Sequence, residues 1–186
     1  ESSDLEWAAK TFSPVKLDCV SYACTAVSFI RGVGYDAEII RRIQMASGSP
    51  ASTTTTAVVA ALQEIGVSKL AVVAPYVDQV CKKLKVYFEE SGFEIVNMIN
   101  LDMSDGMAIG GVPAEKVFDL GVEADIPEAQ ALFISCTALP TLEILDDLEN
   151  HLGKPVISAN QATMWNALKI AGVYSKLDGV GQLYRL

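Results

Sequence analysis

The 186-residue chain contains few of the side chains that most often bind metal ions or nucleic acids. It has one histidine, His151, and its cysteines form no C-x-x-C pair, so a zinc site of the usual spacing is not expected. Lys and Arg number 14 against 23 Asp and Glu, and the net charge of −9 repels phosphate backbones. The sequence has no apolar run of the length that spans a bilayer. Neither nucleic acid nor a membrane is therefore predicted as a partner.

What the chain does have is a large apolar fraction, 51%, which is sufficient for one large α/β domain or two small ones. Its four cysteines, Cys19, Cys24, Cys81 and Cys136, are too sparse for a secreted disulfide scaffold. We therefore expect a cytoplasmic protein with free thiols. Cys19 and Cys81 lie within a predicted strand and a predicted helix, and we interpret them as packing residues.

Apolar runs and amphipathic stretches alternate along the chain, which is typical of βαβ units and a parallel sheet covered on both faces. The predicted strands are 16–24, 69–76, 93–101, 129–136 and 154–160. The predicted helices are 35–48, 49–66, 77–92, 113–124, 141–153 and 161–172. The opening residues, ESSDLEWAAKTF, resemble the middle of an amphipathic helix, and we expect a further segment upstream of them.

Two near-repeated motifs divide the chain into related halves. "ACTA" and "SCTA" place Cys24-Thr25 and Cys136-Thr137 directly after predicted strands. The crossover is predicted in the glycine-rich stretch at 101–126. This gives an N-terminal α/β half, 1–101, to which the C-terminal helix is expected to add, and a C-terminal α/β half, 102–186.

The Cys-Thr pairs indicate a particular chemistry. Ligands of open α/β sheets bind at the carboxyl ends of strands, where both pairs lie. Cys24 and Cys136 on opposite sides of one cleft provide a base or nucleophile on one face and an acid on the other. The Thr25 and Thr137 hydroxyls, with nearby backbone N–H groups, provide donors for a substrate carboxylate. This chemistry requires no metal and no organic cofactor.

Three further positions each allow a structural and a functional interpretation. Thr55 belongs to a Thr53–Thr56 run that either caps a helix or offers hydroxyls to a carboxylate. Tyr76, at a strand end, is either a half-buried aromatic or a hydroxyl donor to a substrate anion. Asn160 either caps the last helix or faces the cleft.

Four stretches, SYACTAVSF, TTTTAVVAALQEIGVSKLAVVAPY, SCTAL and LGKPVISANQATMWNALKIAG, resemble the aspartate/glutamate racemase superfamily. The similarity is greatest to its maleate cis-trans isomerases, arylmalonate decarboxylases and ectoine-utilisation racemase-like proteins. The resemblance implies two pseudo-symmetric, flavodoxin-like or Rossmann-like parallel-sheet halves with the active site between them. It also implies catalysis of a small carboxylate without cofactors. Members of this group often associate, so a homo-oligomer is an open expectation.

The resemblance also implies roles for individual residues. In maleate isomerases the cysteine at the position of Cys24 attacks the substrate double bond, and in racemases the two cysteines exchange the roles of base and acid. Arylmalonate decarboxylases keep only the cysteine at the position of Cys136, so the presence of Cys24 favours an isomerase or racemase. Thr25 and Tyr76 match carboxylate-holding hydroxyls of the family, and Thr137 follows the second cysteine in the same motif.

The chain departs from the family pattern in three places. The family's first strand and its Asn-containing loop are expected upstream of Glu1. Ala26 stands where decarboxylases have Ser, and the loop DMSDGMAIGGVP lacks an Asn found near it in maleate isomerases. The sequence therefore predicts an enzyme similar to maleate isomerases and does not identify which carboxylic acid is its substrate. The alternatives are an amino-acid or hydantoin racemase, an arylmalonate-type decarboxylase and a non-catalytic carboxylate-binding protein.

Overall fold

The structure is a computed structural model that describes residues 2–174 and 176–186. Its strands are β1 (Val20–Tyr22), β2 (Ala51–Thr53), β3 (Lys69–Tyr76), β4 (Glu94–Met103), β5 (Ala131–Ile134) and β6 (Val156–Ser158). Its α-helices are α1 (Ser2–Lys10), α2 (Thr25–Phe29), α3 (Tyr35–Ser47), α4 (Thr54–Glu64), α5 (Asp78–Glu90), α6 (Gly106–Gly110), α7 (Ala114–Ala124), α8 (Leu145–Leu152) and α9 (Ala159–Ile170). Two short 3-10 helices complete the fold, η1 (Leu142–Ile144) and η2 (Gln182–Arg185).

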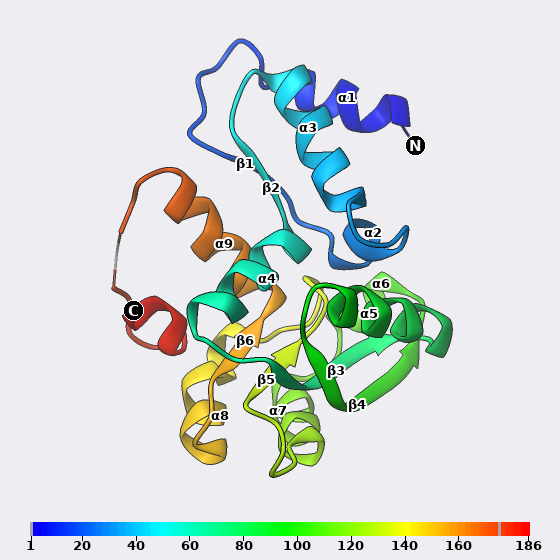
Figure 1. The fold of residues 1–186 in the computed structure, drawn as a ribbon, viewed down its shortest axis with the longest axis vertical. Helices are drawn as coiled ribbons and strands as arrows, with labels where there is room; N and C mark the ends of the chain where they lie inside the picture. Colours follow the sequence, from blue (N-terminus) through cyan, green and yellow to red (C-terminus); the bar gives the residue numbers. More distant parts are fainter. Residues whose placement is uncertain (1, 175) are drawn as a thin grey trace.

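The strands form two parallel sheets, which confirms the predicted α/β class (Figure 1). The smaller sheet pairs β1 with β2, and the larger has the order β4-β3-β5-β6. Every paired strand runs parallel to its neighbour, because a helix returns the chain between successive strands. The carboxyl ends of neighbouring strands in each sheet therefore lie at one edge of that sheet.

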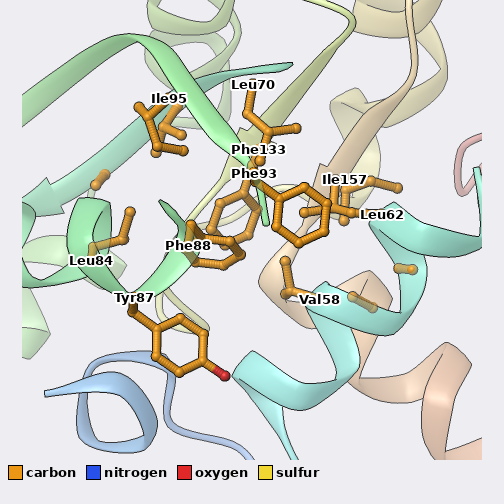
Figure 2. Packing of buried hydrophobic residues seen from close by; sticks show 14 of the residues in the cluster. Val58, Leu62, Leu70, Leu84, Tyr87, Phe88, Phe93, Ile95, Phe133 and Ile157 are labelled. Carbon is orange, nitrogen blue, oxygen red and sulfur yellow. The ribbon is translucent and has the colours of Figure 1, made fainter. Parts of the chain in front are cut away.

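The larger sheet is buried on both faces, and β3 shows this residue by residue. Leu70, Val72 and Ala74 face one core cluster, with side chains of α4 and α5, and Ala71 and Val73 face the other, with side chains of α7 and α8. Figure 2 shows the first cluster, where aromatic rings of α5 and β5 meet residues of α4. Alternating side chains point to opposite faces, so a strand covered on both sides reads as one continuous apolar run.

The two sheets are joined through equivalent helices. α4 follows β2 and α9 follows β6, and the two helices pack against each other. The Thr163 hydroxyl donates to the Thr54 hydroxyl at 3.1 Å, and the Asn166 amide donates to Ser52 at 2.7 Å. The C-terminal helix thus contacts the smaller sheet, although it follows the last strand of the larger one.

The structure differs from the predicted elements in one instructive place. Residues 51–53 form a buried strand, although the hydroxyl-rich sequence there predicts only the entry to a helix. Three residues are too few to show a periodicity, and the strand exists because it pairs with β1. Residue 101, where the two halves are predicted to meet, lies inside β4, and one sheet contains β1 and β2 while the other contains β3 to β6; the division of the chain into halves stays a prediction. Pairing places β4 in the larger sheet, since β3 bonds to both β4 and β5.

Other local predictions agree with the structure. Thr53 is the N-cap of α4, and its hydroxyl accepts from the Thr56 N–H at 3.2 Å. Cys81 is buried in the core on α5, where packing was predicted. Across the described residues, every helix is too short or too polar to cross a bilayer.

Candidate active site

Two cysteine-bearing loops leave the carboxyl ends of β1 and β5. Cys24 follows β1 by two residues and is the N-cap of α2, and Cys136 follows β5 by two residues. The Thr137 hydroxyl donates to the backbone oxygen of Ala23 at 3.2 Å, which joins the two loops directly. Standard chain geometry then keeps the Cα atoms of the two cysteines within about 12 Å of each other. Residues that are 112 positions apart in the sequence therefore lie at one place in the fold.

Tyr76 lies beside the second cysteine at the end of β3. The Ser135 hydroxyl donates to its phenol oxygen at 3.4 Å, and the side chain is nearly buried. Burial raises the pKa of the Tyr76 phenol far above its usual range, and the neighbouring Cys136 raises it further. The hydroxyls of Ser135 and Thr25 lower this pKa only in part. The phenol therefore keeps its proton and can donate it in a hydrogen bond to an anion.

Thr25 is the residue after Cys24, and its hydroxyl is available to donate a hydrogen bond to a ligand. Only 1% of the residue is exposed, yet Thr25 Oγ1 has no hydrogen-bond partner among the described residues. Leaving a buried hydroxyl unpaired costs about 1–3 kcal/mol. Because this hydroxyl lies near the Tyr76 phenol, the two groups form a pair of neutral donors between the cysteine loops.

Cys136 has a backbone conformation that non-glycine residues rarely adopt. Its φ is 97°, in the region that favours glycine, whereas Cys24 has an ordinary extended φ of −142°. Such conformations cost roughly 1–3 kcal/mol and cluster at functional sites. The hydrogen bonds around Cys136 hold the loop in this shape.

Asn160, in the first turn of α9, forms hydrogen bonds to the loop that carries Cys136. Its amide donates to the backbone oxygens of Thr137 at 3.1 Å and Leu139 at 3.5 Å. The cap of α9 is Ser158, which forms a capping box with Gln161, so the suggested capping role of Asn160 is wrong. Its assignment as a carboxylate ligand stays a prediction.

Thr55 lies in the first turn of α4 and is buried. Its hydroxyl is 3.4 Å from that of Thr53 and lies near the Tyr87 phenol, whose pKa is raised by burial and lowered to a smaller extent by Thr55. Both contacts are with other side chains of the protein. A contact of Thr55 with a substrate carboxylate stays a prediction.

The two remaining thiols have pKa values that disfavour reactivity. Burial raises the pKa of Cys81 to about 11, and nearby Asp78 and Asp102 raise it as well. Burial also raises the pKa of Cys19, although the Ser21 hydroxyl opposes the shift. A raised pKa reduces the thiolate fraction at neutral pH, so neither residue has the properties of a nucleophile.

Sequence reasoning missed Ser135 and the Thr137–Ala23 bond. Ser135 ends an apolar strand immediately before a candidate cysteine, and that position was a usable signal. The bond between the loops had no local signal, because its two residues are distant in the sequence.

Comparison with known proteins gives consistent likenesses. Residues 3–184 match the family model for arylmalonate decarboxylase. An arylmalonate decarboxylase of Bordetella bronchiseptica is 31% identical over 168 residues, covering 89% of this chain and 70% of that protein. A maleate isomerase of Geobacillus stearothermophilus is 25% identical over 177 residues, covering 92% of this chain and 70% of that protein.

Solved structures agree with these matches. Unliganded arylmalonate decarboxylase superposes with a TM-score of 0.90 at 28% identity, covering 99% of this chain and 81% of that chain. A Nocardia farcinica maleate cis-trans isomerase mutant with a covalently bound succinylcysteine intermediate has a TM-score of 0.93 at 24% identity, covering 98% of this chain and 77% of that chain. At that identity the likeness shows a shared fold.

The fold and these likenesses define a class of two-domain α/β enzymes that includes decarboxylases and isomerases. The chain belongs to the arylmalonate decarboxylase family.

Proposed function

We propose that this chain is a cofactor-independent isomerase of a small carboxylic or dicarboxylic acid, similar to maleate cis-trans isomerases. The observation that carries the proposal is the 3.2 Å hydrogen bond between Thr137 and Ala23, which brings the loops of Cys24 and Cys136 together. The similar proteins named maleate isomerase support it, as does the succinylcysteine found in one of the shared-fold structures.

The proposed reaction uses one thiol on each face of a cis alkene. The Cys24 thiolate forms a C–S bond to one alkene carbon, and the π electron pair moves to the other carbon and its carboxylate. The Cys136 thiol then protonates that carbon, which leaves a thioether with a single C–C bond that can rotate. The Cys136 thiolate removes the proton again, the double bond re-forms in the trans geometry, and the C–S electron pair returns to Cys24. No electron is gained or lost overall.

Neutral donors stabilise the charge that develops on the carboxylate in this scheme. The unpaired Thr25 hydroxyl and the Tyr76 phenol, which keeps its proton, are the proposed pair. The Thr137 hydroxyl and the Asn160 amide donate to backbone oxygens, and a contact of either group with the carboxylate stays a prediction. A ligand oxygen that accepts from Thr25 would also relieve the cost of its buried, unpaired hydroxyl.

Decarboxylation is the second candidate, because the relative at 31% identity is an arylmalonate decarboxylase. In that reaction one thiol protonates an enediolate after loss of CO2, so Cys136 acts and Cys24 does not. An amino-acid or hydantoin racemase, in turn, requires both thiols for proton transfer.

The proposal predicts that Cys24→Ala abolishes turnover of maleate while the protein stays folded. Wild type, Cys24→Ala and Cys136→Ala would each be incubated with maleate in D2O, with the alkene signals followed by NMR and the protein by mass spectrometry. We expect wild type to form fumarate, and Cys136→Ala to be slower by about 10²–10⁴-fold. Undiminished turnover by Cys24→Ala would refute the mechanism.

The same experiment separates the alternatives when the substrate is varied. Release of CO2 from an arylmalonate by Cys24→Ala indicates a decarboxylase. Exchange of an amino-acid α-proton for deuterium, without alkene chemistry, indicates a racemase. Saturable carboxylate binding without any turnover, together with slow thiol alkylation that ignores the ligand, indicates a non-catalytic binding protein.

A further inference from the structure

A half-buried carboxylate outside the cysteine loops joins three helices. Asp36 lies in the first turn of α3, and its Oδ2 accepts hydrogen bonds from the Thr56 hydroxyl of α4 and the Tyr87 phenol of α5, both at 2.9 Å. Its Oδ1 accepts from the Gly34 N–H at 3.2 Å. Hydrogen bonds to an ionised acceptor are stronger than those between neutral groups, so this carboxylate fixes the position of both hydroxyls.

The Tyr87 ring connects this carboxylate to the helix of Cys24. Figure 2 shows Tyr87 pointing away from Phe88, with its oxygen near the end of the helix that carries Val58, α4. Its ring lies 6.4 Å from that of Phe29, and Phe29 meets the Tyr76 ring edge-on at 6.1 Å. Phe29 therefore packs between the ring held by Asp36 and the candidate donor Tyr76.

Phe29 is also the last residue of α2, whose N-cap is Cys24. The Ser28 hydroxyl donates to the backbone oxygens of Cys24 and Thr25, both at 2.9 Å, so this short helix is tied together along its length. Its far end is bound to α5, because the Lys83 amine donates to the Ile30 oxygen at 3.1 Å. A displacement of Phe29 would consequently move α2 and, with it, Cys24.

We propose that Asp36 is a positioning residue for Cys24, acting through Tyr87 and Phe29. Tyr87 is 3% exposed, and its phenol would lose its acceptor if the carboxylate were removed. Without this hydrogen bond the ring would no longer be fixed in place, and α2, which packs on it through Phe29, would loosen. The inference rests on the proposed role of Cys24, but its effect can be measured on the helix and the thiol without any substrate.

The test uses two nearly isosteric variants and one matched control. Asp36→Asn keeps the shape of the side chain. When its amide oxygen accepts from Tyr87, however, its NH2 group faces the Gly34 N–H, which is also a donor. Tyr87→Phe keeps the ring and removes the hydrogen bond. Thr56→Val removes the other hydroxyl donor to the same carboxylate and leaves the Tyr87 bond intact.

Two readouts follow the loosening directly. The amides of Ser28 and Ile30, which close α2, should exchange hydrogen about fivefold faster in Asp36→Asn and Tyr87→Phe. Cys24, which is partly buried, should be alkylated by iodoacetamide faster by a similar factor of about five. Chymotryptic cleavage after Tyr22 separates Cys24 from Cys19 for mass analysis.

The remaining cysteines and the control decide the outcome. Cys81 and Cys136 should be alkylated within about twofold of wild type in all variants, and Thr56→Val should leave α2 unchanged. Faster alkylation of all the thiols together would mean general destabilisation and would overturn the proposal. So would an unchanged α2 in Tyr87→Phe, or an effect of Thr56→Val equal to that of Asp36→Asn.

Turnover provides the readout that a purely structural role would not move. If the chain isomerises maleate, Asp36→Asn should lower kcat by about tenfold to a hundredfold and leave KM nearly unchanged, because a misplaced nucleophile affects the chemical step. If wild type has no turnover, the proposed function fails, whereas hydrogen exchange and alkylation still decide the role of Asp36.

Discussion

At the scale of single residues, Cys136 combines a candidate catalytic thiol with a costly backbone conformation. Its φ of 97° is one that glycine adopts without a steric penalty. The adjoining residues offset the cost, since Ser135 is bonded to Tyr76 and Thr137 to Ala23. The thiol at this position therefore stands where the backbone favours glycine, which agrees with the role proposed for it.

This strain predicts that Cys136→Gly is more stable than Cys136→Ala by about 1 kcal/mol. Urea denaturation of the two variants measures the difference, and both lack the thiol, so only the backbone preference is compared. The control pair is Cys24→Gly and Cys24→Ala, where φ is −142° and glycine should be the less stable residue. If Cys136→Gly were no more stable than Cys136→Ala, the strain would not exist in solution.

At the scale of elements, the chain after α9 is held by carboxylates of α8. Asp146 accepts from the N–H groups of Gly179 at 3.0 Å and Gly181 at 2.6 Å, and Glu149 accepts from that of Gln182 at 2.7 Å. Glu149 also accepts from the Val156 N–H of β6, so the same carboxylate contacts a strand of the larger sheet. The docking of η2 is thus coupled to the strand that leads into Asn160 and the candidate site.

Two glycines in this segment allow a matched comparison. Gly179 and Gly181 both have a φ of 82°, but a Cβ on Gly181 would lie 2.5 Å from Gln161 Nε2, whereas one on Gly179 would meet open space. Gly179→Ala should cost about 1 kcal/mol from backbone strain alone. Gly181→Ala should cost roughly 1–3 kcal/mol more, because the Gln161 bond to Val180 must also be displaced. Urea midpoints measure both, and equal costs would contradict the packing of the tail on α9.

At the scale of the whole molecule, acid should release both ends of the chain. The Gly181 N–H and Arg185 hold the pKa of Asp146 below its usual value of 3.8. Arg42 likewise lowers the pKa of Glu6, which ties α1 to α3. A lowered pKa means that the folded state favours the charged form, so this stability is complete above the usual pKa and is lost as pH falls through the lowered one.

Asp146→Asn removes that contribution while keeping the shape of the side chain. We expect the variant to be less stable than wild type at neutral pH, and we expect the difference to shrink as pH falls through the lowered pKa. Urea midpoints of both proteins between neutral pH and about pH 3 give the comparison. Comparison with the variant is needed because burial raises the pKa of Glu149, whose contribution has the opposite slope and declines as pH rises. A constant difference across this range would contradict the assignment.

The sequence by itself determined the features that depend on near neighbours along the chain. Apolar runs indicated β3 to β6, the hydroxyl run indicated the cap at Thr53, and the repeated Cys-Thr motif placed two thiols at strand ends. Periodicity and capping act over a few residues, so a pattern is sufficient to predict them. The resemblance to the family likewise came from contiguous motifs, and the matches confirm it.

Only the tertiary structure decided how those pieces meet. It assigned β3 and β4 to the larger sheet, added β2, and joined the loops of the two cysteines through Thr137. It also brought Asp36 to Tyr87, a pair 51 positions apart. Each of these outcomes depends on contacts between segments that are distant in the sequence. The free energy of such contacts depends on the packing of the whole chain, so no short stretch of sequence predicts them.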